Sequence, residues 1–353
     1  LRVRLLVDES THHPAASPPT LGRIRRVAAD LAQRAGIDDL GRVRPQAVGR
    51  VLALAFPDRL AIRRGSPGRF QLRTGTTCFM SPSEALAAET FLVAADLDGR
   101  RKDARIRLAA GIDQADVLDR FSHQIRTRRS LSWEGDRLVD RTESRLGGIV
   151  LERHDQRPEP GVEATAALTR RVRDRGIEAL PWSRSALALR ERVNHLHDSV
   201  GGEWPDWSDP ALRRSVEDWL APHLANASGW DDVQDLDMAK VLRSMLGYEL
   251  VQLLDRMAPT HIVVPSGRRI PVDYGRDSPT VSVRVQEMFG SNQTPRIGGK
   301  PVVLELLSPA NRPLQITSDL AGFWKGSWSE VRKEMAGRYP KHAWPEDPAS
   351  AHP

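Results

Sequence analysis

Apolar residues recur at helical spacing near the start of the chain. Leu21, Ile24, Val27 and Leu31 lie three or four positions apart, which places them on one face of a helix. Gly36 is typical of a helix end. The same spacing returns over residues 47–55, where Ala47, Val51, Leu54 and Ala55 precede Pro57. We therefore predict two helices and assign residues 1–64 to a helical region.

Between Arg69 and Leu151 the apolar runs become shorter and are separated by turns. The strand candidates are Thr90–Ala95, Ala104–Ala109, Ser130–Trp133, Arg137–Asp140 and Gly148–Leu151. Glu134-Gly135-Asp136 is predicted to form a hairpin turn between two of them. Five or six short strands in fewer than a hundred residues indicate a small barrel, and a five-stranded OB-like barrel is the obvious candidate. We assign it to residues 65–155.

Residues 156–225 begin with a linker rich in proline and continue as a helical segment. Four ranges have a helical pattern: Glu163–Arg175, Ser185–Asp198, Asp209–Leu224 and Leu236–Met257. Ser208 followed by Asp209-Pro210 is a favourable start for the third, because serine caps a helix and proline fits its first turn.

The last part of the chain, residues 226–353, mixes strands and helices. The expected strands are His261–Ser266, Ile270–Tyr274, Pro301–Leu307 and Arg312–Thr317. Ser278–Phe289 fits a helix or a strand, and we favour a helix. Ser327 and Glu330 match a capping box that opens a last helix towards Tyr339, and the proline-rich tail after Trp344 is expected to be loose. The predicted fold class is α+β and multidomain: a helical accessory region, an OB-like small β-barrel, a helical segment and a mixed α/β C-terminal domain.

Positive charge is concentrated at the N-terminal end. The chain has a net charge of +6. The first 75 residues hold 14 arginines and six acidic residues, which leaves the remainder near −2. A localised basic region favours an acidic partner such as nucleic acid.

Cysteine content and hydropathy favour a cytoplasmic protein. Cys78 is the only cysteine, so an intramolecular disulfide and a cysteine-based zinc site are excluded. No run of eighteen apolar residues and no signal peptide is present, so we expect no membrane partner. The chain opens at Leu1 in what reads as mid-domain sequence, and we expect it to be a fragment or to lack its start.

The motifs of known catalytic and metal sites are incomplete in this sequence. Gly298-Gly299-Lys300 has Thr294 where a phosphate-binding loop needs glycine, and Pro301 where magnesium needs a hydroxyl. His195 and His197 are two apart, so a helix would not place them on one face for zinc. We predict no catalytic residue, no metal site and no cofactor in this chain, although a hydrolase with clustered carboxylates stays open.

Residues suited to binding, but not to catalysis, are concentrated in the last hundred residues. Arginines and lysines there lie beside proline-fixed turns and aromatic rings, a combination that neutralises phosphate and stacks on bases. Burial in the core or at a domain interface is the alternative for the two tryptophans. The nucleic-acid-binding candidates are Arg268, Arg269, Arg276, Trp324, Lys325, Trp328 and Lys341.

Several long runs, in order, resemble a known family. They are LALAFPDRL (residues 52–60), LVAADLDG (92–99), ARIRLAA (104–110), LPW (180–182), WPDW (204–207), VPSGRRIPVDY (264–274), VRVQEMFG (283–290), LLSPANRPLQ (306–315) and RYPKHAWP (338–345). The chain resembles the C-terminal half of HrpB-type ATP-dependent RNA helicases, of the DEAH/RHA class in superfamily 2.

The resemblance implies a division of labour. In this family two RecA-like domains, which precede the region seen here, bind ATP with magnesium and drive movement along RNA. By this resemblance, residues 1–64 would be the end of the helical accessory, ratchet-like region and residues 226–353 the HrpB-type C-terminal domain. This chain would bind single-stranded RNA in a salt-sensitive way and support that upstream motor, without ATP hydrolysis of its own. The alternative is a stand-alone, non-enzymatic module that binds RNA or another protein.

Overall fold

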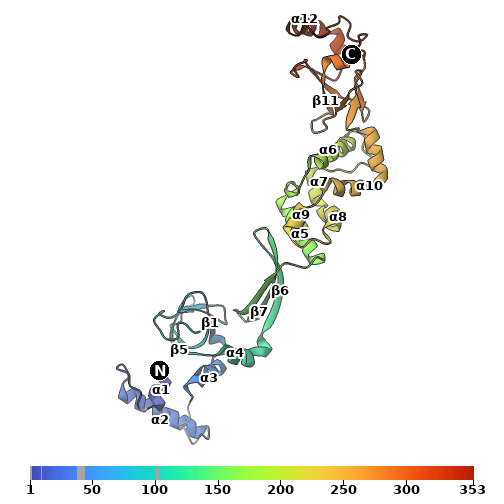
Figure 1. Cartoon of the computed structure of the whole chain (residues 1–353). Coiled ribbons are helices and arrows are strands. Elements are labelled where there is room, and N and C mark those ends of the chain that lie inside the picture. Colours follow the sequence, from blue (N-terminus) through green and yellow to red (C-terminus); the bar gives the residue numbers. More distant parts are fainter. Residues whose placement is uncertain (1, 9, 38–43, 101–102) are drawn as a thin grey trace. The chain divides into compact units, whose positions relative to one another are not determined.

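The structure, a computed structural model, describes residues 2–8, 10–37, 44–100 and 103–353. The chain packs into two compact units, and Figure 1 follows its course through them. Unit 1 comprises Leu1–Ser130 and Asp140–Gln156, and unit 2 comprises Leu131–Val139 and Arg157–Pro353. Helices, a closed barrel and separate small sheets confirm the predicted multidomain α+β class. None of the described helices is both long and apolar enough to cross a bilayer.

Both helices expected at the start of unit 1 are present. The helices here are α1 (Arg2–Val7), α2 (Pro18–Arg34) and α3 (Val48–Ala55). Two prolines at the first turn of α2 suit a helix start, because their missing N–H groups would have no partner there. The apolar stripe of these helices is not covered: Ile24, Val27, Leu31, Val51 and Leu54 are 40% to 61% exposed.

Five short strands form a closed barrel in the order β1-β2-β3-β5-β4, with β4 pairing back to β1. They are β1 (Leu60–Arg63), β2 (Arg69–Leu72), β3 (Thr77–Phe79), β4 (Phe91–Leu97) and β5 (Ala104–Gly111). Strands β3 and β5 run parallel and the other neighbours antiparallel. Alternate residues point inward and fill the barrel, among them Ala61, Phe70, Leu72, Cys78, Leu92 and Ile106.

A second apolar cluster closes one side of the barrel. Helix α4 (Gln114–Phe121) contributes Val117 and Phe121, which pack with residues of α3, β1 and β4. The turn between β7 (Arg137–Leu146) and β8 (Ile149–Gln156) adds Leu146 and Ile149. The N–H of Gly148 in this turn donates to the carbonyl of Arg73 at 2.7 Å, so the turn is fixed to the barrel.

The three later strands of the predicted barrel belong to a separate sheet. Strand β6 (Arg126–Glu134) lies beside β7, and β8 lies on the other side of β7. The placement of these strands in the barrel was therefore wrong. Their middle parts carry polar and charged residues at successive positions, so they offer no apolar face to a barrel interior. The Gly135 turn between β6 and β7 is confirmed, with φ at +61°.

Unit 2 opens with a helical segment that follows the predicted ranges. The helices are α5 (Val162–Arg175), α6 (Arg184–Ser199), α7 (Asp209–Arg214), α8 (Val216–Leu220), α9 (Trp230–Gln234) and α10 (Met238–Met257). The Ser208 hydroxyl accepts a hydrogen bond from the N–H of Ala211, which confirms the predicted cap. The helix expected over 209–224 is instead broken at Ser215. Helix α10 is interrupted at Gly247, where φ is +75°.

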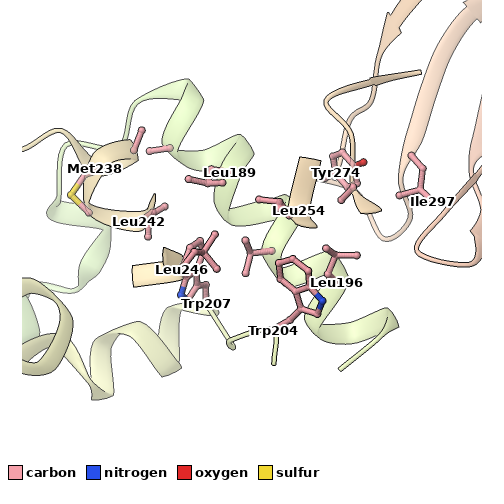
Figure 2. Packing of buried hydrophobic residues seen from close by; sticks show 14 of the residues in the cluster. Leu189, Leu196, Trp204, Trp207, Met238, Leu242, Leu246, Leu254, Tyr274 and Ile297 are labelled. Atoms are coloured by element: carbon pink, nitrogen blue, oxygen red, sulfur yellow. The ribbon is translucent and has the colours of Figure 1, made fainter. Parts of the chain in front are cut away.

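Helices α6 and α10 face each other across the main apolar core of unit 2. Figure 2 shows side chains from both helices, with Trp204 and Trp207 beside them and with Tyr274 and Ile297 from the C-terminal part of the unit. The core is therefore continuous from the helical segment into the C-terminal strands.

Short strands and two helices complete unit 2. They are β9 (His261–Val263), β10 (Arg269–Pro271), β11 (Thr280–Arg284), β12 (Arg296–Ile297), β13 (Lys300–Pro301), β14 (Val303–Leu307), β15 (Pro313–Thr317), α11 (Leu320–Lys325) and α12 (Trp328–Arg338). Strand β11 runs parallel to β14, which pairs antiparallel with β15 as expected. Strands β9 and β10 form a hairpin.

Three expectations for this part were wrong. The range 278–289 holds strand β11 and no α-helix, because Val281 and Val283 alternate inward and pair with β14. Helix α12 begins after Ser327, but the Ser327 side chain makes no capping hydrogen bond. The tail is packed: the carbonyl of Pro345 accepts from the Trp328 indole, and that of Pro348 accepts from the N–H of Gly290.

Candidate nucleic-acid interface

The outer face of the barrel in unit 1 carries an aromatic ring between two arginines. Arg69 of β2 lies directly opposite Phe79 of β3, and Phe79 lies directly opposite Arg105 of β5. We call these three residues the barrel row. Both arginines are exposed and the ring is half-buried. The Arg69 guanidinium lies 5.6 Å from the centre of the Phe79 ring, within cation–π range.

The strand alternation explains why these side chains share one face. Phe70, Cys78 and Ala104 are the inward neighbours of the row, and they too are paired across β2, β3 and β5. Because successive side chains of a strand point to opposite faces, the barrel row must point outward.

Gly68 allows the row to form at the end of the β1–β2 loop. Its φ is +83°, and a Cβ atom there would lie 2.6 Å from the carbonyl oxygen of Met80. The N–H of Met80 donates to the carbonyl of Gly68 at 2.9 Å. The close approach brings the start of β2 against the end of β3, and so aligns Arg69 with Phe79.

More polar groups surround the barrel row. Arg64 donates to the Gln71 side chain at 2.9 Å, and Arg107 is exposed on the same face of β5 as Arg105. Asp103 lies 3.7 Å from Arg69 and accepts from the Thr77 hydroxyl at 2.7 Å. An exposed ion pair of this length is weak, so it leaves Arg69 available to a stronger anion.

The loop between β4 and β5 begins with an organised carboxylate. Desolvation raises the pKa of Asp98, but hydrogen bonds from the backbone N–H groups of Arg100 and Arg105, and the charges of Arg100 and Arg107, outweigh it, so the pKa is lowered. The charged carboxylate thereby holds the backbone at the start of a basic loop. The combination of an aromatic face with exposed guanidinium groups can stack a base and neutralise phosphates.

The predicted candidates lie in unit 2, and the structure corrects two of them. Trp324 and Trp328 are 7% and 1% exposed. Their indole N–H groups donate to the carbonyls of Ser291 and Pro345. The rings pack against each other and against neighbouring aromatic residues, so neither ring has a face free to stack on a base. They are core residues, which was the stated alternative.

The five basic candidates remain on the surface. Arg268 pairs with Glu287, and Arg276 pairs with Asp273 at 3.1 Å. Arg269, Lys325 and Lys341 are exposed. All five stay candidates for phosphate contact, but the two tryptophan rings beside Lys325 are buried.

Sequence reasoning missed the barrel row. The alternation of Arg69-Phe70-Gln71-Leu72 and of Ala104-Arg105-Ile106-Arg107 contains the signal, because it places three arginines and one glutamine at the four outward positions. The three-residue strand Thr77–Phe79 is too short for its period to be recognised without its neighbours.

The structure also excludes a phosphate-binding loop at Gly298-Gly299-Lys300. These glycines have φ of +57° and +79° and form the turn between the antiparallel strands β12 and β13. A phosphate-binding loop connects a strand to a helix, so this motif cannot hold ATP. Among the residues that the structure describes, no three histidine, cysteine or acidic side chains cluster to hold a metal ion.

Two hollows in unit 2 have carboxylates in their linings. The larger, about 730 Å³, is lined by Arg173, Asp174, Ile177, Glu178, Asp209, Pro210, Arg213 and Arg214. The smaller, about 200 Å³, includes Asp255, whose carboxylate accepts from Arg192 at 2.7 Å. The larger lining holds three carboxylates, Asp174, Glu178 and Asp209, together with three arginines, and Asp209 also pairs with Arg190. In the smaller hollow the Asp255 carboxylate is paired with Arg192. The carboxylates of both hollows therefore lie among arginine charges.

Comparison with known proteins confirms the resemblance seen in the sequence. Residues 219–348 match the family described as ATP-dependent helicase C-terminal (HrpB_C). Over 339 residues, 94% of this chain, the sequence is 37% identical to the ATP-dependent RNA helicase HrpB of Escherichia coli strain K12. The chain spans 41% of the length of that relative.

One solved structure supports the sequence comparison, and a second is reported beside it. A crystal structure of the E. coli DExH-box NTPase HrpB matches with a TM-score of 0.54 and 35% identity, covering 96% of this chain and 42% of that one. A crystal structure of the Escherichia coli DEAH/RHA helicase HrpB gives a TM-score of 0.48 and 32% identity, with the same coverage. The chain is thus similar over nearly its whole length to the C-terminal region of HrpB-type helicases.

Proposed function

We propose that this chain, the counterpart of the C-terminal region of HrpB-type helicases, holds single-stranded RNA for an ATP-driven motor located elsewhere in the protein. The observation that carries the proposal is the barrel row on a closed five-stranded barrel. The strand order, with β3 parallel to β5, is consistent with an OB-type barrel, an architecture that binds single strands by stacking and electrostatics.

ATP and magnesium would be bound by RecA-like domains upstream of this region. The described residues offer no phosphate-binding loop and no metal cluster of their own. This chain alone is therefore expected to show no ATP hydrolysis. A cytoplasmic location remains a prediction, supported by the single cysteine, Cys78, which is buried in the barrel.

The uncovered stripe on α2 and α3 supports docking of that motor. Ile24, Val27 and Leu31 lie at helical spacing on α2, and Val51 and Leu54 add to the apolar surface on α3. Concentrated exposed apolar residues of this kind mark interaction sites. In the complete protein, we expect Val27→Glu to weaken the coupling between RNA binding and ATP hydrolysis while leaving RNA binding by this chain unchanged.

A binding titration tests the proposal directly. The chain is titrated against a fluorescently labelled uridine oligomer and against a duplex of equal length, at two salt concentrations. We expect preference for the single strand and weaker binding at higher salt. For Arg69→Gln/Arg105→Gln we expect the slope of log affinity against log salt to fall by about 1.4, since each phosphate contact to a single strand contributes about 0.7.

A matched control separates a specific effect from loss of charge. Arg184→Gln/Arg243→Gln removes the same charge from exposed positions on α6 and α10, and should leave affinity and slope unchanged. Equal effects of the two double variants, or absence of RNA binding by the unmodified chain, would refute the proposal.

A further inference from the structure

Strand β6 presents a second basic surface within unit 1. It lies at one edge of the sheet β6-β7-β8, and Arg126, Thr127, Arg128 and Arg129 at its start are all exposed. Arg126 and Arg128 are two positions apart, so their side chains leave the same face of the strand. We call these two residues the β6 arginine strip.

The arginines of β7 and β8 that lie in unit 1, Arg141, Arg145 and Arg153, are matched with carboxylates. Arg141 makes a bidentate pair with Asp155, with both N···O distances at 2.8 Å. Glu143 accepts from both Arg145 and Arg153 at 2.9 Å. Both β7 and β8 are therefore close to electrically balanced along this part of the sheet.

Arg129 also pairs with a carboxylate, and in this it differs from Arg126 and Arg128. Its guanidinium Nε lies 2.9 Å from each oxygen of Asp140, a carboxylate that is only 2% exposed. Removing Arg129 would leave the buried Asp140 carboxylate without a positive partner, so we assign Arg129 a structural role.

The β6 arginine strip has no such match. Among the described residues, no carboxylate lies within ion-pair range of Arg126 or Arg128, and Arg126 donates only to the backbone carbonyl of His123 at 3.1 Å. Neither side chain contributes to the apolar core of unit 1. Two exposed guanidinium groups thus remain as net positive charge on the part of the sheet that lies in unit 1, whose other arginines are paired.

The geometry of the strip fits a nucleic-acid backbone. Residues two apart on a strand are separated by about 6.6–6.8 Å, which is comparable to the spacing of successive phosphates along an extended single strand. The outer edge of β6 pairs with no other strand of the described sheet. The backbone N–H groups on that edge are therefore additional hydrogen-bond donors beside the two arginines.

We propose that the β6 arginine strip is a second RNA contact, which binds consecutive phosphates of the strand without reading its bases. The inference rests on the proposed function and extends it, because it adds a phosphate-only contact to a barrel row that also stacks. A different explanation is edge protection: charged residues on an edge strand prevent pairing with other chains. Charge of either sign would serve that purpose, whereas phosphate binding needs positive charge.

The test uses charge removal and charge reversal in the full chain. Arg126→Gln/Arg128→Gln and Arg126→Glu/Arg128→Glu are compared with the control Arg184→Gln/Arg243→Gln, all titrated with labelled uridine and adenosine oligomers over a range of salt. We expect charge removal to lower the salt slope by about 1.4 and the affinity at low salt by about tenfold, equally for both oligomers. Charge reversal should lower the affinity further. Circular dichroism and gel filtration should show folded, unassociated protein in every case, because the side chains are exposed.

The outcomes distinguish this inference from the proposed function. If the barrel-row variants lose RNA and the strip variants bind like the control, the second contact is refuted and the proposed function stands. If Arg126→Glu/Arg128→Glu binds RNA normally, the strip serves edge protection or a protein partner, and again only this inference fails. If the unmodified chain binds no RNA, both are refuted.

Discussion

The Arg69 guanidinium lies 5.6 Å from the centre of the Phe79 ring, across the pairing of β2 with β3. This contact holds an exposed cation beside the aromatic face on which a base would stack. Arg105 lies on the other side of the ring, directly opposite on β5. Stacking and charge neutralisation are thereby concentrated on three neighbouring strands whose inward residues form the barrel core.

Phe79→Leu should weaken single-stranded RNA binding by about tenfold, because it keeps an apolar side chain but removes the stacking face. The salt slope should stay the same, since no charge changes. Fluorescence anisotropy at several salt concentrations measures both quantities.

Phe79→Tyr is the matched control for this prediction, because it retains the aromatic face and should retain the affinity. A Leu variant that binds as tightly as the original chain would show that the ring does not contact a base.

Gly68→Ala should destabilise the barrel by more than about 1 kcal/mol, since it combines a left-handed φ with a clash. The added Cβ would lie 2.6 Å from the Met80 carbonyl oxygen. Gly65→Ala is the comparison: its φ is +64°, but a Cβ there meets no atom within 4 Å. Urea unfolding should therefore give a clearly lower midpoint for the Gly68 variant, and equal midpoints would contradict the close approach.

The sequence predicted well those elements whose pattern is long enough to repeat. Helices α2 and α5 and strands β4 and β5 each contain several turns or alternations, and all were expected close to their observed ranges. The three-residue strand β3 shows too little alternation to be recognised, and its role depends on pairing with residues 104–105. The barrel was therefore predicted with two of its strands, β4 and β5, correct, while β6, β7 and β8 were placed in it wrongly and β1, β2 and β3 were missed.

The site was harder to predict than the fold, because exposure is set by tertiary packing. Trp324 and Trp328 flank Lys325 in the sequence, which suggests a basic aromatic surface. In the structure the two rings enter the core while the Lys325 side chain stays outside. The local sequence shows which chemical groups are present, but it does not show whether a side chain is buried or exposed.

Trp328→Ala should cost about 3–5 kcal/mol of folding stability, the usual range for removing a large buried ring. Trp328 is 1% exposed and lies within 6 Å of the rings of Phe289, Trp324 and Trp344. Because the ring does not face solvent, RNA affinity per folded molecule should be unchanged. Denaturant unfolding followed by an RNA titration measures both.

Trp328→Phe and Lys325→Ala are controls for that experiment. The first keeps a ring but loses the hydrogen bond to Pro345, so its cost should be smaller. The second changes an exposed side chain, so stability should be unaffected. A stable Trp328→Ala variant with lost RNA binding would instead restore a direct role for the indole.

Glu191→Gln should stabilise unit 2 at neutral pH but not in acid. Desolvation raises the pKa of Glu191, the negative charge of Asp273 raises it further, and Arg190 opposes both. The carboxylate lies against Gly275, where a Cβ would be 3.0 Å from Glu191 Oε1. Because the folded pKa lies above the ordinary value of 4.5, the folded state favours the protonated form. The stabilising contribution of Glu191 is thus complete below about pH 4.5 and is lost as pH rises through the folded pKa.

Glutamine has nearly the same shape and stays neutral, so the variant keeps that contribution at every pH. The difference in unfolding free energy between variant and original should be near zero in acid and should favour the variant as pH rises. Urea titrations from acid to neutral pH measure it. Glu203→Gln, at an exposed position, should show no such trend. A Glu191→Gln variant that is less stable at neutral pH would mean that the charged carboxylate makes a favourable contact, which would outweigh the desolvation that raises its pKa.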